Sequence, residues 1–162
     1  MDNCLLRLKR VRGIANYQFE QKIGRKLFPK EVKILLSKRT GRIRHLYLEE
    51  ALIATLRPTD GFFSLTIAGA RKLSSLINAP RFRVAVQNDV KEFAKKGRDV
   101  FARHVSTADL NIKPGEETIV TDDHDEVLAI GRAVLTGEEM LAFKRGVAVK
   151  SRRGVTESRN VA

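Results

Sequence analysis

The chain has 162 residues, of which 43% are hydrophobic and 31% charged, and its 31 Lys and Arg against 19 Asp and Glu give a net charge of +12. These proportions exclude wholesale disorder, and the length allows one ordinary domain or two small ones. No apolar run approaches the roughly 18 residues of a membrane-spanning helix, and the N-terminus lacks the apolar stretch of a signal peptide. The single cysteine, Cys4, excludes an intrachain disulfide. We therefore expect a soluble, cytoplasmic protein without a membrane partner.

The positive charge is concentrated in the N-terminal half. Residues 1–80 carry 16 basic and 6 acidic side chains, whereas residues 81–162 carry 15 and 13. The densest basic stretches are residues 7–44 and residues 144–162. Such stretches bind polyanions because each neutralised phosphate releases condensed counterions. Proteins of thermophiles are also rich in Lys and Arg, but they usually balance these charges with Glu. The imbalance here favours nucleic-acid binding.

The N-terminal half predicts a small α+β domain. Its two helices are expected at residues 16–28, with Asn16 as N-cap, and at residues 66–77, with Thr66 as N-cap. Turn signals with glycine, at residues 38–41 and 58–61, join short apolar runs into two strand pairs. The four expected strands are residues 31–37, 42–48, 52–56 and 62–65. Asn78-Ala79-Pro80 then breaks the second helix, so the first domain is expected to cover residues 1–79.

The C-terminal half predicts many short strands with turn signals between them, which is typical of a small closed barrel or sandwich. A short helix over residues 89–96 is expected to end at Gly97, and a helical turn starts at Thr136. The second domain is expected to cover residues 80–155. The polar chain from Ser151 onward is expected to fray, with residues 156–162 as a disordered tail. The expected strands are residues 82–86, 100–105, 117–121, 127–135 and 147–150.

No constellation of residues in the chain indicates catalysis. Cys4 has no histidine near it in sequence, and the three histidines show no paired-ligand spacing. The acidic run at residues 122–125 lacks the glycine and the distal glutamate of a calcium loop, so we interpret it as a solvated turn. The glycines form no phosphate-binding loop of the dinucleotide or Walker type. We therefore expect no catalytic residue, no metal and no cofactor.

Four segments of the C-terminal half carry a specific resemblance. They are Val84-Ala85-Val86-Gln87-Asn88-Asp89-Val90, residues 92–102, Gly131-Arg132-Ala133-Val134-Leu135 and Gly146-Val147-Ala148-Val149-Lys150. Their order of helix, Gly loop, Val-Phe-Ala strand, Pro-Gly loop and Gly-Val-Ala-Val strand resembles the PUA domain. This resemblance implies an RNA-binding β-pseudobarrel.

Residues 14–77 resemble the small domain that precedes the PUA domain in archaeosine tRNA-guanine transglycosylase. That family exchanges a base in a TIM barrel that carries catalytic carboxylates and a Cys/His zinc site, and a barrel needs about 250 residues. The chain therefore resembles only the non-catalytic, RNA-binding C-terminal portion of such an enzyme, either as a separate subunit or standing alone. The motifs of this resemblance are residues 17–19, 27–29, 37–44, 52–57 and 60–65.

The resemblance implies an RNA groove formed by the first helix, the Gly loop and the last strand of the PUA domain, which in that family holds the acceptor stem and 3′ end of tRNA. Phe93 either stacks on an unpaired base or is an ordinary core contact, and the cations either pair with phosphates or form a solvated face. The residues placed in this groove are Phe93, Lys95, Lys96, Gly97, Arg98, Arg132, Lys144, Arg145 and Lys150.

In the first domain, the tip of the first hairpin is the best candidate for binding phosphates, with Arg25 and Lys26 as weaker companions. Its residues are Lys38, Arg39, Arg42 and Arg44. The expected function is to bind tRNA or another structured RNA and to present it to a transglycosylase subunit that alters a base. Two alternatives stay open. One is an RNA-binding factor linked to translation or the ribosome, and the other is a stand-alone enzyme with an unfamiliar site.

Overall fold

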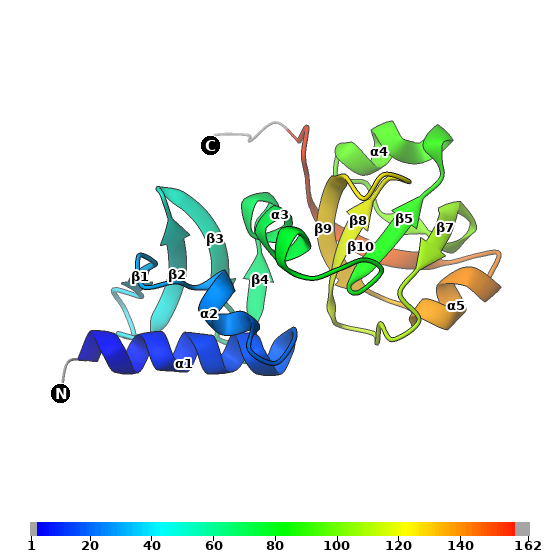
Figure 1. Ribbon diagram of the computed structural model, residues 1–162. Helices are drawn as coiled ribbons and strands as arrows, with labels where there is room; N and C mark the ends of the chain where they lie inside the picture. The colour runs from blue at the N-terminus through cyan, green and yellow to red at the C-terminus, as the bar shows by residue number, and fades with distance from the viewer. Residues whose placement is uncertain (1–2, 158–162) are drawn as a thin grey trace. The chain divides into compact units, whose positions relative to one another are not determined.

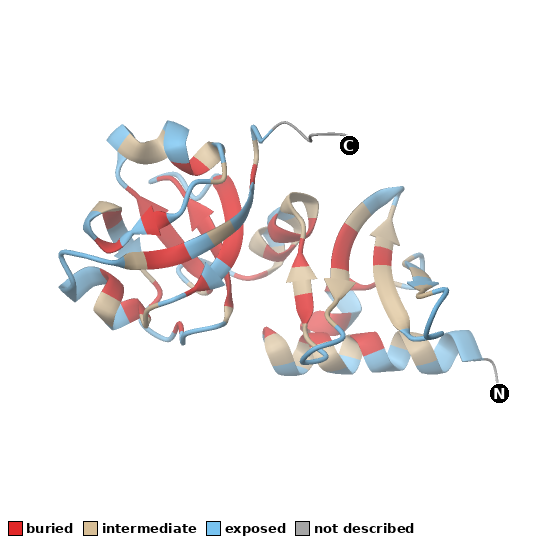
Figure 2. Cartoon of the chain, turned by 180° about the vertical axis from the view of Figure 1, so that it is seen from behind, coloured by how far each residue is buried: buried red, intermediate tan, exposed pale blue. Residues whose placement is uncertain are grey.

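The computed structural model describes residues 3–157 and shows two compact units (Figure 1). Unit 1 comprises the described residues up to Leu76, and unit 2 begins at Ile77. In each unit the buried residues are concentrated on the strands and on the inward faces of the helices (Figure 2). Each unit therefore has a hydrophobic core of its own, as an independent domain requires.

Unit 1 is a four-stranded antiparallel sheet with three helices, in the strand order β1-β2-β3-β4. Gly41 and Gly61 have φ values of 67° and 75°, so both expected hairpin turns use a left-handed glycine. The Thr66 hydroxyl accepts a hydrogen bond from the N–H of Gly69, which confirms Thr66 as the N-cap of the last helix. The elements are α1 (Asn3–Gln18), α2 (Ile23–Leu27), β1 (Lys33–Leu36), β2 (Ile43–Leu48), β3 (Ala51–Leu56), β4 (Phe63–Leu65) and α3 (Ile67–Leu76).

The prediction of one helix over residues 16–28 was wrong. Residues 3–18 form α1 instead, and α2 begins at Ile23 after Lys22 adopts a left-handed φ of 68°. Asn16 lies inside α1, and its side-chain oxygen accepts a 2.7 Å hydrogen bond from the N–H of Gly24 in α2. The Asn16 side chain therefore does satisfy a backbone donor at the start of a helix, as an N-cap residue does. The helix that it caps is α2, whereas Asn16 itself lies in α1.

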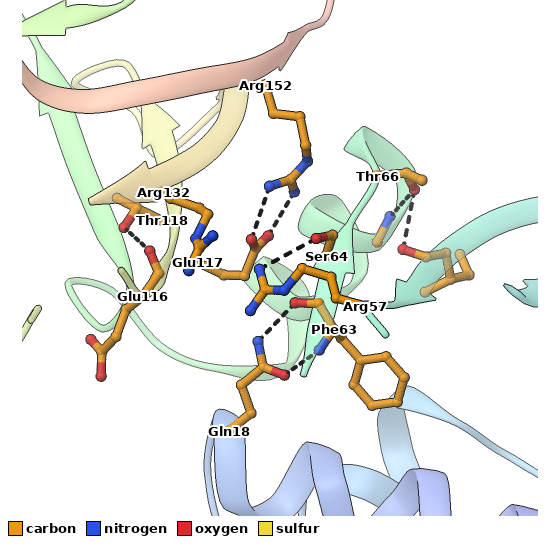
Figure 3. A network of polar contacts seen from close by, with 12 residues as sticks. Gln18, Arg57, Phe63, Ser64, Thr66, Glu116, Glu117, Thr118, Arg132 and Arg152 are labelled. Carbon is orange, nitrogen blue, oxygen red and sulfur yellow. Dashed lines mark hydrogen bonds and ion pairs between the residues drawn. The ribbon is translucent and has the colours of Figure 1, made fainter. Parts of the chain in front are cut away.

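The core of unit 1 forms around the rings of Phe28 and Phe63, whose centroids lie 5.1 Å apart and whose planes are tilted by 57°. At the sheet edge, the side-chain amide of Gln18 pairs with the backbone of Phe63 (Figure 3). It donates to the Phe63 carbonyl at 2.9 Å and accepts from the Phe63 N–H at 2.7 Å. The Gln18 side chain, at the end of α1, thus makes the two backbone hydrogen bonds with the edge strand β4 that a neighbouring strand would otherwise make.

Unit 2 is a six-stranded mixed sheet in the order β6-β10-β9-β8-β5-β7, with β5 and β8 parallel and all other pairs antiparallel. The sheet is nearly closed around an apolar core, which confirms the expected pseudobarrel. The elements are β5 (Arg83–Val86), η1 (Asn88–Val90), α4 (Lys91–Lys95), β6 (Val100–Phe101), η2 (Ala102–His104), β7 (Val105–Ala108), β8 (Glu117–Thr121), β9 (Val127–Ala133), α5 (Gly137–Ala142) and β10 (Val147–Gly154).

The prediction of a single strand over residues 100–105 was wrong. This run forms β6, the 3-10 turn η2 and the start of β7, which are the two outer strands of the sheet order and the turn between them. The N–H of Ala102 bonds to the Gly146 carbonyl and the N–H of Gln87 bonds to the His104 carbonyl. The turn therefore carries the chain from one edge of the sheet to the other and helps to close the barrel.

The chain from Ser151 does not fray, because β10 continues to Gly154. A β-bulge between Ser151 and Arg153 leaves Arg152 as the extra residue, and its guanidinium donates two hydrogen bonds to the buried carboxylate of Glu117 (Figure 3). Beyond the strand, the N–H of Thr156 bonds to the Lys95 carbonyl at 3.0 Å. Of the expected tail, residues 158–162 lie outside the described residues.

Candidate nucleic-acid interface

Unit 1 contains a groove of about 1020 Å³ that is rich in arginine. It is lined by the first half of α1, by the turn between β1 and β2, and by the turn between β3 and β4. These segments are far apart in the sequence, and the fold of unit 1 brings them around one hollow. Six guanidinium groups line it: Arg7, Arg10, Arg39, Arg42, Arg44 and Arg57.

No Asp or Glu lines this groove in the part of the chain that the structure describes. Arg57 is engaged, because it forms an ion pair of 2.9 Å with Asp60. Among residues 3–157, none of the other five arginines takes part in an ion pair. Within residues 3–157, five guanidinium groups without an ion-pair partner therefore line one hollow, where each can form two parallel hydrogen bonds to a phosphate.

The structure places three of the four hairpin residues proposed from the sequence in this groove. Arg39, Arg42 and Arg44 line the groove, whereas Lys38 is exposed outside it. Sequence reasoning missed Arg7 and Arg10, which lie on one face of α1 at the i, i+3 spacing of neighbours on a helix. That spacing was available in the sequence, but it carries meaning only once residues 3–18 are known to be helical.

Unit 2 contains a smaller cleft, of about 520 Å³, beside α4. Phe93 lines it with 60% of its surface exposed, so the interpretation of Phe93 as a core contact was wrong. On the same short helix Ala94 is buried, and Val90 just before it packs against the barrel core. Arg98 also lines the cleft. The polar and aromatic lining residues that the sequence interpretation did not include are Asp89, Asp99, Phe101, Arg103 and His104.

Gly97 contacts its own chain. A Cβ atom placed on it would lie 3.1 Å from the Gly154 nitrogen and 2.9 Å from a carboxylate oxygen of Glu157. Lys95 is similarly engaged, because its carbonyl accepts hydrogen bonds from the N–H and the hydroxyl of Thr156. The close backbone approach that this glycine permits is therefore used by the C-terminal strand.

The remaining cations proposed for the groove do not line the cleft. Arg132 and Lys150 are register partners on β9 and β10, and both are exposed. Lys96, Lys144 and Arg145 do not line the cleft. Of the nine residues proposed for this groove, the structure thus brings together Phe93 with Arg98 in the cleft and Arg132 with Lys150 on the strands.

The acidic run at residues 122–125 forms a braced turn between β8 and β9. Burial alone would raise the pKa of the Asp122 carboxyl, but hydrogen bonds from Lys91 and from the N–H groups of Glu126 and His124 outweigh it and lower this pKa to about 2. The same Lys91–Asp122 bond raises the pKa of Lys91. Across residues 3–157 no group of three or more His, Cys, Asp or Glu is arranged to hold a metal ion.

Two family models match the chain, one on each unit. Residues 9–80 match the patch-forming domain C2 of tRNA-guanine transglycosylase, and residues 82–155 match the PUA domain. The chain is a C2 domain followed by a PUA domain. Among residues 3–157, no helix has both the length and the apolar character needed to cross a bilayer.

The C2 and PUA domains together are homologous to the C-terminal part of archaeal enzymes described as tRNA-guanine(15) transglycosylase. The chain is 42% identical over 147 residues to the enzyme of Methanothermobacter thermautotrophicus, which covers 91% of this chain and 22% of that protein. It is also 42% identical over 147 residues to the enzyme of Thermococcus kodakarensis, covering 25% of it. The chain thus spans about a quarter of the length of these relatives.

Two solved structures match the fold of the chain over most of its length at low sequence identity. A hypothetical protein from Pyrococcus horikoshii superposes with a TM-score of 0.74 at 22% identity, covering 93% of this chain and 91% of that one. A conserved PUA domain protein from Thermoplasma acidophilum superposes with a TM-score of 0.68 at 16% identity, covering 97% and 93%. At these identities the likeness concerns the fold alone.

Proposed function

We propose that this chain binds tRNA and presents it to a tRNA-guanine transglycosylase or a related base-modifying enzyme of the archaeosine pathway. The observation that carries the proposal is the C2 groove, in which five arginines without ion-pair partners among the described residues face one hollow without a lining carboxylate. Such a groove fits the phosphates of a folded RNA and reads backbone position with little information about base identity. In this function the chain is a non-catalytic, cytoplasmic RNA-binding portion or subunit.

The relatives support the choice of tRNA. Their name describes a transglycosylase that acts on tRNA guanine, and this chain matches about a quarter of their length. A separate catalytic partner would supply the reaction. The PUA domain supports RNA as the ligand, and it adds a second surface, the cleft beside α4.

The groove is tested by a salt titration of tRNA binding. We expect Arg39→Ala/Arg42→Ala to weaken binding and to reduce the slope of log K against log salt by about one unit for each phosphate that the variant no longer neutralises. The matched control is Lys30→Ala/Lys33→Ala, which removes the same charge from exposed positions of the C2 domain outside the groove. Unchanged affinity and slope in the groove variant would exclude this groove as the tRNA site.

The partner is tested by crosslinking the protein to cellular RNA, sequencing the recovered RNA, and identifying the proteins that co-purify. Recovery of tRNA together with a transglycosylase catalytic chain is the expected result. Co-sedimentation with ribosomal subunits, without such a chain, would replace the proposal with a translation-linked factor. Base exchange by the purified chain alone would show an enzyme.

A further inference from the structure

Two of the three residues in the motif at 17–19 have a clear role in the C2 domain, and Tyr17 does not. Gln18 bonds to the backbone of Phe63, and Phe19 is buried in the core. Tyr17 is 82% exposed, more than any other exposed large apolar or aromatic side chain among residues 3–157. Its hydroxyl makes no hydrogen bond to any residue of that range. The packing of the domain therefore gives no reason for a tyrosine at this position.

The Tyr17 ring stacks on the ring of Phe62, which precedes β4. The two centroids lie 5.9 Å apart and the planes differ by 5°, so the rings form an offset parallel stack. The backbone of Phe62 is held on both sides, because its N–H bonds to the Asp60 carboxylate at 3.0 Å and its carbonyl accepts the Arg57 N–H at 2.9 Å. Phe62 thus supports the Tyr17 ring, most of whose surface stays open to solvent. We call this pair of rings the aromatic shelf.

The aromatic shelf adjoins the C2 groove through both of its residues. Gly61 lines the groove, and Phe62 is the next residue of the chain. On α1, Tyr17 follows Arg10 by seven residues, which is close to two helical turns and places both on the same face of the helix. Gly13 lies between them on this face, and a Cβ atom there would meet nothing within 4 Å. The helix surface from the groove to the shelf is therefore open to a ligand.

The charges beside the shelf indicate the kind of ligand. The groove arginines other than Arg57 have no ion-pair partner among residues 3–157, so they attract phosphate. The Asp60 carboxylate is compensated by the Arg57 guanidinium at 2.9 Å, and the exposed Glu20 does not line the groove. An apolar protein surface would cover the rings but would leave the arginines without an anion. A nucleotide supplies both a base that stacks on a ring and a phosphate that pairs with arginine.

We propose that the aromatic shelf stacks on one unpaired base of the RNA, at a bulge or internal loop whose flanking phosphates lie in the C2 groove. The base must be unpaired, because inside a duplex both of its faces are covered by neighbouring bases. The inference rests on the proposed function, since it names a subsite for the same RNA. It gives a groove that reads only phosphates a preference for RNA whose helix is interrupted.

The probes are RNA hairpins with one common stem that is fully paired, carries one bulged adenosine, or carries one bulged abasic nucleotide. The abasic bulge interrupts the helix and has the same number of phosphates as the adenosine bulge, but it offers no base to stack. Fluorescence anisotropy with the full chain measures Kd for each hairpin. We expect the adenosine bulge to bind about 10-fold more tightly than the abasic bulge, as stacking on an aromatic side chain provides.

Three variants separate stacking from other contributions. Tyr17→Ala should lose most of the 10-fold gain and keep the salt slope of the fully paired hairpin, since it removes a ring and no charge. Tyr17→Phe should keep the gain, because the ring remains. The matched control is Phe93→Ala, which truncates an exposed ring of the PUA domain and should also keep the gain. Both positions are exposed, and thermal unfolding shows that each variant is folded.

The failures are distinguishable. If the chain binds none of the hairpins, the proposed function is wrong. If it binds the fully paired hairpin but does not distinguish the adenosine bulge from the abasic one, or if the gain survives in Tyr17→Ala, the shelf is not a base site and the groove proposal stands. Loss of the gain in Tyr17→Phe as well would overturn stacking. Loss of co-purifying proteins from Tyr17→Ala with unchanged RNA binding would make the shelf a protein contact instead.

Discussion

The Nζ atom of Lys91 lies 2.8 Å from the Oδ2 atom of Asp122, and this contact joins α4 to the turn between β8 and β9. The carboxylate is nearly buried, with 2% of its side chain exposed, and it also accepts two backbone N–H bonds within its own turn. Since α4 carries Phe93 and forms one side of the cleft, the same contact fixes the position of the cleft relative to the barrel.

We predict that Asp122→Asn lowers the free energy of unfolding by about 2 kcal/mol at pH 7, because it removes a charged hydrogen-bond acceptor with three donors. The pKa of Asp122 is lowered on folding, so its stabilisation is complete above the ordinary value of 3.8 and is lost as the pH falls toward about 2. Urea unfolding between about pH 2 and pH 7 checks this. The difference in unfolding free energy between wild type and variant should shrink as the pH falls through that range. A difference that is independent of pH would contradict the lowered pKa of Asp122. Asp123→Asn, at the exposed neighbour, is the control.

Arg152 and Glu117 form the second contact on which the barrel depends. Their two hydrogen bonds measure 2.9 and 2.7 Å, and only 2% of the Glu117 side chain is exposed. We predict that Arg152→Ala costs about 3 kcal/mol of unfolding free energy, because it removes two charged hydrogen bonds from a buried carboxylate. Arg153→Ala, one residue further along the same bulged strand, removes an exposed side chain and should cost less than about 0.5 kcal/mol. If urea unfolding showed the same loss of free energy for Arg152→Ala and Arg153→Ala, the Arg152–Glu117 pair would not be what stabilises the barrel.

Neighbouring positions on α1 give a sharp test of the C2 groove. Arg10 lines the groove and Lys9 does not, although both are exposed cations on the same helix. Arg10→Ala should therefore weaken tRNA binding and lower the salt slope by about one unit, whereas Lys9→Ala should leave the slope nearly unchanged. A titration of Kd between roughly 50 and 200 mM salt measures both slopes. Equal effects would mean that the helix attracts RNA by its net charge and not through this groove.

The turns, caps and family motifs of this chain were predictable because their signals are local. Gly41 and Gly61 occupy left-handed turn positions, and Thr66 caps the helix that follows it. These residue types are favoured by the backbone geometry of their own few residues, whatever the rest of the chain does.

The start of α1 and the path through residues 100–105 were not predictable in this way. Only Val11 and Ala15 of α1 are buried, so the helix has no apolar stripe of the width that periodicity detects. In residues 100–105, buried positions alternate with less buried ones as in a strand, yet η2 turns the chain there. Parts of both candidate surfaces were missed for the same reason, because Arg7, Arg10 and Phe101 belong to these segments.

Two glycines of α1 and α2 give a last prediction, because replacing each with alanine should change the stability in opposite directions. A Cβ atom on Gly24 would lie 2.3 Å from the Arg12 carbonyl oxygen, so Gly24→Ala must push the helices apart and should cost about 2 kcal/mol or more. A Cβ atom on Gly13 meets nothing within 4 Å, and Gly13 lies in the exposed interior of α1. Gly13→Ala should therefore stabilise the C2 domain by up to about 1 kcal/mol, because alanine loses less backbone entropy in a helix. Urea unfolding of both variants measures the difference, and a loss of stability in Gly13→Ala would show that α1 is not helical at this point.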